Sequence, residues 1–126
     1  MPREALIEAA RAARERAYAP YSGYMVGAAL LCANGAIYKG CNVENASYSL
    51  TICAERNAIF QAVADGQQDF LAMAVMGNNH AIPCGACLQV MSEFAPTMPL
   101  YIASAVEEKI IETSVDALLP TQFHLK

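Results

Sequence analysis

Hydrophobic positions in the first half of the chain alternate between a helical and an extended pattern. Small and apolar side chains fall at helical spacing after Pro2, which suits a first turn, and before Pro20, which ends the pattern; they are Ala5, Leu6, Ala9, Ala12, Ala13 and Ala17. Residues 25–32 and 36–43 are short apolar runs separated by Ala33-Asn34-Gly35, and the Asn-Gly pair readily takes the positive φ of a tight hairpin. They predict two antiparallel strands.

The next segments continue the alternation of helix and strand. Thr51 is a plausible N-cap of a helix that runs to about Asp65 and ends at Gly66. Its apolar residues, Ile52, Ile59, Phe60 and Val63, predict one buried face. The nearly continuous apolar run at residues 70–77 is typical of a central strand covered on both faces, and residues 99–104 predict another strand.

The remaining elements lie between and after these two strands. Pro83 is expected to open a helix that runs to about Phe94 before Pro96, and residues 109–112 predict a weak strand. Ser114 is expected to cap a short helix before Pro120. The pattern as a whole predicts a single three-layer α/β domain over residues 1–126, with the sheet in the middle.

Composition narrows the classes of function. The 126 residues are 56% hydrophobic and 16% charged, which fits one compact domain with a core. The chain lacks the roughly 20 consecutive apolar residues of a membrane span, and its first residues are charged where a signal peptide is apolar, so we expect a soluble, cytoplasmic protein. A net charge of -4 without a basic cluster argues against nucleic-acid binding.

The spacing of the cysteines points to chemistry. Five cysteines without a secretion signal favour metal binding or thiol chemistry over a disulfide framework. Cys84 and Cys87, two residues apart at a predicted helix start, fit a thioredoxin-like redox pair and half of a zinc site equally well. The first interpretation makes the protein a thiol-disulfide oxidoreductase.

Cys53 and Glu55 favour the zinc interpretation. Cys53 also lies at the start of a helix that follows strands, so three thiolates could share one ion and leave a fourth position open, as in a catalytic zinc site. Glu55 points roughly 200° around the helix from Cys53, which suits a proton shuttle facing the metal's water rather than a fourth ligand. As a simpler alternative, Glu55 is a favourable acid in a first helical turn.

A second group of residues bears on the same site. Three thiolates around one divalent cation leave a net negative charge. Arg56 can offset it by donating hydrogen bonds to a thiolate, but its position fits a solvated surface residue equally well. His80 could complete a structural Cys3His zinc site in a non-catalytic module, and His124 is a weaker candidate. Cys32 and Cys41 are expected to be buried, inert thiols.

Cys53-Ala54-Glu55 followed by Pro83-Cys84-Gly85-Ala86-Cys87 resembles the three-cysteine form of the zinc-deaminase signature. The segments "AYAPYSGYMVGAALL", "GCNVENASYSLTICAERNAIF" and "PCGACLQVMSEF" are similar to small homotetrameric cytidine deaminases of nucleoside salvage, over nearly the whole chain. The resemblance implies a deaminase-like α/β/α fold with a mixed sheet of about five strands. It also implies hydrolysis of cytidine or deoxycytidine to the uracil nucleoside and ammonia, with zinc as cofactor.

The resemblance also implies roles for individual residues. Cys53, Cys84 and Cys87 match the zinc ligands, and Glu55 matches the residue that passes a proton from the activated water to ring N3 and then to the leaving amine. The matching substrate-binding positions are Asn42 and Glu44 for the ribose hydroxyls, Ala54, Tyr24 where the family usually has phenylalanine, and Ala46, Tyr48 and Phe123 for a neighbouring subunit's pocket. A homotetramer with shared sites is therefore expected.

Three departures from the family pattern concern substrate choice. Leu88 replaces a common arginine, Ile82 replaces a common serine, and the loop before Pro83 is shorter than usual. All three lie near the predicted metal helix or base pocket. A deaminase that prefers modified cytosine nucleosides is therefore an alternative to one that acts on cytidine itself.

Overall fold

The computed structural model describes residues 3–125, so the expected role of Pro2 lies outside the described residues. Its elements in chain order are α1 (Arg3–Arg14), β1 (Gly27–Cys32), β2 (Ile37–Cys41), the 3-10 turn η1 (Tyr48–Leu50), α2 (Ala54–Ala64), β3 (Phe70–Gly77), α3 (Gly85–Phe94), β4 (Pro99–Ser104), β5 (Ile111–Ser114) and α4 (Val115–Leu118).

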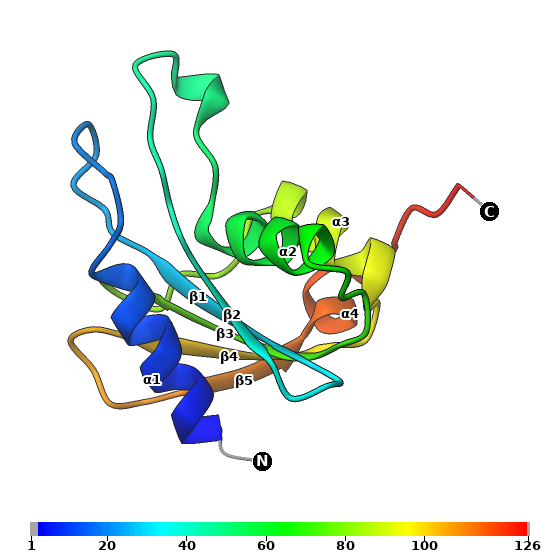
Figure 1. Cartoon of the computed structure of the whole chain (residues 1–126). Helices are drawn as coiled ribbons and strands as arrows, with labels where there is room; N and C mark the ends of the chain where they lie inside the picture. The colour runs from blue at the N-terminus through cyan, green and yellow to red at the C-terminus, as the bar shows by residue number, and fades with distance from the viewer. Residues whose placement is uncertain (1–2, 126) are drawn as a thin grey trace.

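The five strands form one mixed sheet between two layers of helices. Their order is β2-β1-β3-β4-β5, in which only the β3–β4 pair of the described sheet is parallel. Helix α1 covers one face, and α2, α3 and α4 cover the other (Figure 1). The predicted three-layer α/β fold with a mixed five-stranded sheet is confirmed, and β3 is its central strand.

Side chains alternate between the two faces of the central strands. The α2/α3/α4 face buries the larger residues, among them Leu30, Met73, Val75, Leu100 and Ile102, whereas the α1 face of the same strands is rich in alanine. The pairing of β1 with β3 contains one irregularity: Leu31 pairs with Ala72 and Cys32 with Phe70, so Leu71 has no partner on β1. The Phe70 side chain therefore lies on the α2/α3/α4 face. There Phe70 contacts Phe94 with ring centroids 5.3 Å apart.

Helix α2 lies unusually close to the edge strand β2. A Cβ atom at Gly40 would lie 2.5 Å from both the Ala54 carbonyl oxygen and the Ala58 nitrogen, which is closer than any real side chain approaches a backbone. Glycine is therefore required at position 40, and the small residues Ala54, Ala58 and Ala62 form the buried face of the helix. This close approach fixes the height of the α2 N-terminus above the sheet.

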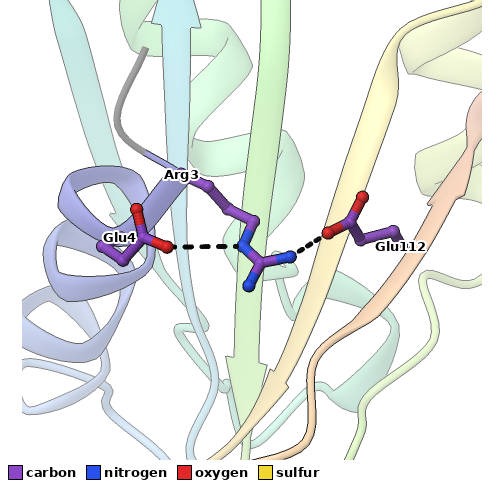
Figure 2. Close-up of polar contacts among 3 residues, drawn as sticks. All are labelled: Arg3, Glu4 and Glu112. Carbon is purple, nitrogen blue, oxygen red and sulfur yellow. Dashed lines mark hydrogen bonds and ion pairs between the residues drawn. The ribbon is translucent and has the colours of Figure 1, made fainter.

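The start of α1 is linked to β5 at the other edge of the sheet. The Arg3 guanidinium pairs with Glu112 and lies 3.8 Å from the Glu4 carboxylate (Figure 2). These side chains are partly exposed to water, where such pairs contribute about 0–1 kcal/mol. The contact therefore orients α1 more than it stabilises the fold.

Several predicted boundaries are wrong by a few residues. Helix α1 ends at Arg14, well before Pro20, because the N–H groups of residues 15–17 bond to the carbonyls three residues earlier rather than four. Strand β5 begins at Ile111, two residues later than predicted. Phe60 is not in the buried face of α2, since 48% of its surface is exposed. In the hairpin, Gly35 takes φ 91°, whereas Asn34 keeps a negative φ, as do all other described non-glycine residues.

Two predicted ends are confirmed by their geometry. Gly66, with φ 90°, follows Asp65, the C-cap of α2. The Ser114 hydroxyl accepts a hydrogen bond of 3.3 Å from the Ala117 N–H and so caps α4. Across residues 3–125, the helices are all too short or too polar to cross a membrane.

Candidate active site

Two helices begin at cysteines rather than at the predicted residues. Cys53, not Thr51, is the N-cap of α2, and Cys84, one residue after Pro83, is the N-cap of α3. Both have extended backbones (ψ 153° and 168°), and their carbonyls accept the first helical hydrogen bonds. Thr51 instead ends η1. The prediction relied on the residues that are preferred as N-caps, and cysteine is not among them.

The three predicted ligand cysteines converge. The sulfurs of Cys53, Cys84 and Cys87 lie within 4.8 Å of one another, and those of Cys84 and Cys87 are 3.6 Å apart. Tetrahedral zinc with Zn–S bonds of about 2.3 Å separates its sulfur ligands by about 3.8 Å. The cluster therefore fits a zinc ion with little adjustment.

Neither histidine belongs to this cluster. His80 Nε2–H donates to the Lys109 carbonyl (2.7 Å), and His124 contacts Gln122. Within residues 3–125 the three sulfurs are the one group of three candidate ligand atoms, so the protein side supplies three ligands. A three-ligand set leaves a position open for water or substrate, which is typical of catalytic zinc.

Arg56 supplies positive charge to the thiolates. Its Nη2 donates to Cys53 Sγ at 3.5 Å, while its Nε is buried without a partner in the described chain. The pKa of Cys53 is lowered to about 5, chiefly because the Cys87 thiol donates a hydrogen bond to it and partly because of Arg56. The same hydrogen bond, with burial, raises the pKa of Cys87. Binding of a metal ion to these sulfurs would displace the protons of the thiols.

Glu55 is buried in the first turn of α2, beside Cys53. The pKa of Glu55 is raised to about 7, chiefly by burial and also by the nearby Cys53 thiolate, while a hydrogen bond to its own N–H and the charge of Arg56 oppose the rise. A carboxyl group whose pKa lies near neutral pH can both accept and donate protons under physiological conditions.

A cavity of about 270 Å³ opens beside these groups. Its lining includes eight predicted site residues: Tyr24, Asn42, Glu44, Tyr48, Cys53, Ala54, Glu55 and Cys84. Ser22, Val26, Thr51, Ala81 and Ile82 complete it. The volume suits a small molecule of nucleoside size.

Glu44 and Asn42 are held in place by the segment before β1. The Glu44 carboxylate accepts hydrogen bonds from the N–H groups of Tyr21 (2.9 Å) and Ser22 (3.1 Å) and from the Ser22 hydroxyl. Asn42 Nδ2 donates to the Tyr24 carbonyl (2.8 Å), and its Oδ1 accepts from the Val26 N–H (2.9 Å). Sequence reasoning missed Ser22, because nothing in the sequence pairs it with a carboxylate 22 residues away.

The remaining predicted residues are placed differently. Tyr48 lines the cavity of its own chain, whereas Ala46 and Phe123 are exposed and are not among the described residues that line it. Of the departures from the family pattern, Ile82 lines the cavity, whereas Leu88 is buried in the core between α3 and the sheet. Cys32 is buried and Cys41 half-buried, and burial raises the pKa of both thiols.

Comparison with known proteins agrees with this geometry. The family model described as the cytidine and deoxycytidylate deaminase zinc-binding region matches residues 1–103. Cytidine deaminase of Sporosarcina psychrophila is 50% identical over 123 residues (95% of this chain, 90% of the relative), and that of Halalkalibacterium halodurans is 46% identical over 125 residues (98% and 95%).

A solved structure gives the same result. The 1.6 Å crystal structure of cytidine deaminase from Burkholderia pseudomallei has a TM-score of 0.93 and 50% identity, and the match covers 98% of this chain and 100% of the other. These matches favour a deaminase over the thiol-disulfide oxidoreductase that Cys84 and Cys87 alone allowed. With its three converging sulfurs, the chain belongs to the zinc-binding cytidine and deoxycytidylate deaminase family.

Proposed function

We propose that this protein hydrolyses cytidine or deoxycytidine to the corresponding uracil nucleoside and ammonia. The observation that carries the proposal is the arrangement of one cavity. Its lining includes Cys53 and Cys84, whose sulfurs cluster with that of the buried Cys87, together with Glu55, Asn42 and Glu44. The names of the relatives support the same reaction.

The zinc ligands are Cys53, Cys84 and Cys87. Zinc bound there supplies a water molecule of lowered pKa in the coordination position that the protein leaves open. Arg56 and the N-termini of α2 and α3 offset the negative charge of the three thiolates, which would otherwise weaken this effect.

Glu55 moves the protons. It accepts a proton from the attacking water and donates it to ring N3 as the C4–O bond forms. It then delivers the second proton of that water to the exocyclic nitrogen, so that the C4–N bond breaks and ammonia leaves. The raised pKa of Glu55 supports this role, because the same group must act first as base and then as acid.

The other residues of the cavity lining bind the sugar and the base. The ionised Glu44 carboxylate and the Asn42 amide offer acceptors and a donor for the vicinal sugar hydroxyls. Tyr24 and Ala54 border the base. Since Glu44 and Asn42 are themselves held by the 21–26 segment, sugar binding depends on that segment as well.

The active assembly is a homotetramer in which Ala46 and Phe123 reach a neighbouring subunit's site, as does the exposed part of Tyr48, whose remainder lines the cavity of its own chain. The support is the exposure of two apolar segments that stand away from the body: the η1 loop, with Tyr48 62% exposed, and the C-terminal tail, with Phe123 66% exposed (Figure 1). Three free thiolates as ligands require a reducing compartment, which supports the cytoplasm and a role in nucleoside salvage.

The central test replaces the proton shuttle. Glu55→Gln keeps the size of the side chain but removes its acid/base function, so the variant should keep its zinc and lose at least about a hundredfold in kcat. The loss of ultraviolet absorbance on deamination of cytidine and deoxycytidine measures turnover, and elemental analysis measures zinc.

Glu93→Gln is the matched control, because Glu93 lies exposed on α3 away from the cavity. It should behave like the parent protein. Near-normal turnover of Glu55→Gln with zinc bound would remove Glu55 from the mechanism. Activity towards protein disulfides that persists after a chelator has removed the metal would instead support the oxidoreductase.

A further inference from the structure

The Tyr24 side chain is fixed at both of its ends. At the backbone, its carbonyl accepts the 2.8 Å hydrogen bond from Asn42. At the tip of the ring, its hydroxyl donates to Asn79 Oδ1 in the loop between β3 and α3. The ring itself lines the cavity. A phenylalanine at this position would lack the second attachment.

The tip of the ring also occupies a tight slot above Gly77. A Cβ atom at Gly77 would lie 2.8 Å from the Tyr24 hydroxyl oxygen and 2.8 Å from Ala81 Cβ. The hydroxyl therefore sits between the last residue of β3 and the loop that follows it. The ring has little freedom to tilt away from the cavity without breaking its bond to Asn79.

The loop that accepts this bond is held on its far side as well. The Asn78 carbonyl accepts a hydrogen bond from the Ser104 hydroxyl (3.1 Å), and the Asn78 side chain accepts one from Arg14. His80 donates to the Lys109 carbonyl. The loop then continues directly into Ala81 and Ile82, which line the cavity beside Cys84.

We propose that the Tyr24–Asn79 hydrogen bond determines substrate specificity by joining the aromatic wall of the cavity to the Ala81–Ile82 wall. This inference rests on the proposed function. The joined walls resist widening of the pocket, so a base that carries an added methyl group is accommodated less well than cytosine. Asn79 acts as a positioning residue in this arrangement, and Tyr24 as the residue it positions.

The test compares the selectivity of variants rather than their rates alone. The values of kcat/KM are measured for cytidine, N4-methylcytidine and 5-methylcytidine. Asn79→Ala should keep kcat/KM for cytidine within about threefold of the parent value. The ratio of kcat/KM for a methylated analogue to kcat/KM for cytidine should rise about two- to tenfold for at least one analogue, which is the effect of losing one partly exposed hydrogen bond. Tyr24→Phe should raise the same ratio.

Three further variants separate this role from a general loosening of the fold. The double variant Asn79→Ala/Tyr24→Phe should shift the ratio no more than either single variant, since both remove one interaction. Asn79→Asp keeps an acceptor oxygen and should restore the parent ratio. Tyr21→Phe, which removes an exposed tyrosine hydroxyl from the same segment, should leave the ratio unchanged.

Equilibrium binding keeps the two proposals distinguishable. Calorimetric Kd values for uridine and 5-methyluridine report the width of the pocket without any turnover. A parent protein that binds these nucleosides but deaminates none of the three substrates would refute the proposed function alone. Selectivity that is unchanged in Asn79→Ala, both in turnover and in binding, would overturn the present inference, as would fully additive effects in the double variant.

Discussion

Two carboxyl groups that line the same cavity have pKa values shifted in opposite directions because their surroundings differ. Glu55 is buried among apolar atoms and a thiolate, so its pKa rises. The pKa of Glu44 is lowered, first by the hydrogen bond from the Ser22 hydroxyl and then by the N–H groups of Ser22 and Tyr21, against the opposing effect of burial. The first carboxyl group is thereby suited to exchange protons and the second to remain ionised.

Replacing Ser22 tests the stabilisation of Glu44. Because the pKa of Glu44 is lower in the folded chain than the ordinary value of 4.5, its hydrogen bonds stabilise the fold above that pH and cease to do so as the pH falls through the folded pKa. Ser22→Ala should therefore lower Tm by a few degrees at pH 7, and its difference from the parent protein should shrink as the pH falls below 4.5.

Thermal unfolding of both proteins across this pH range measures the effect. Ser49→Ala, at an exposed position in η1, is the matched control and should show no pH-dependent difference. A difference between Ser22→Ala and the parent protein that stays constant with pH would mean that Ser22 acts through packing rather than through the carboxylate.

At the scale of elements, the distance between β2 and α2 decides where the site lies. Gly40 lets the helix approach until its backbone nearly touches the strand, and the same helix carries Cys53 and Glu55 at its first turn. Any residue that pushes α2 outwards therefore also displaces the proposed zinc ligand Cys53 and the proposed proton shuttle Glu55 relative to Cys84 and Cys87 at the start of α3.

Gly40→Ala should consequently weaken both the fold and the metal site. Overpacking of a tight contact costs about 1–3 kcal/mol, and the contact here is with backbone atoms that cannot rotate away. Urea denaturation should show this loss, and elemental analysis should show reduced zinc. Gly85→Ala is the control, because its Cβ would have nothing within 4 Å. Equal stability of the two variants would contradict the close approach.

The order and type of the elements could be predicted from the sequence, because periodicity reflects which faces are buried. The start of α4 at Ser114 could be predicted as well, whereas the starts of α2 and α3 could not. Thr51 and Pro83 satisfied the general rules for helix initiation, but Cys53 and Cys84 occupy the caps because their sulfurs are needed at that point. The convergence of Cys53, Cys84 and Cys87 could be predicted from their spacing. Ser22 and Asn79, by contrast, form hydrogen bonds with residues far away in the chain, which no local pattern reports.

At the scale of the molecule, exposed apolar side chains on two projecting segments support the proposed homotetramer. The η1 loop and the tail around Phe123 project away from the layers of the fold (Figure 1). The Phe123 carbonyl accepts a hydrogen bond from Gln89 of α3 (2.9 Å), which anchors the base of the tail while leaving the ring exposed. This arrangement is suited to presenting an aromatic side chain to another copy of the chain.

Subunit complementation tests this arrangement. Light scattering should give four times the mass of one chain. Phe123→Ala should lower activity without dissociating the tetramer. Co-expression with the inactive Glu55→Gln chain should recover part of the activity, because a site with an intact Glu55 can then receive an intact Phe123 from a neighbouring subunit. Pairing Phe123→Ala with the double variant Glu55→Gln/Phe123→Ala is the control and should recover nothing. A purely monomeric, fully active Phe123→Ala protein would contradict shared sites.

The convergence of Cys53 with Cys84 and Cys87 has a consequence for the lifetime of the protein in the cell. One ion held by these three sulfurs would join two helices that follow different strands, and would act as a removable cross-link as well as a cofactor. A ligand that binds only the native chain stabilises it in proportion to the logarithm of its free concentration. Zinc starvation should therefore deplete the protein by unfolding and proteolysis, and not merely switch it off.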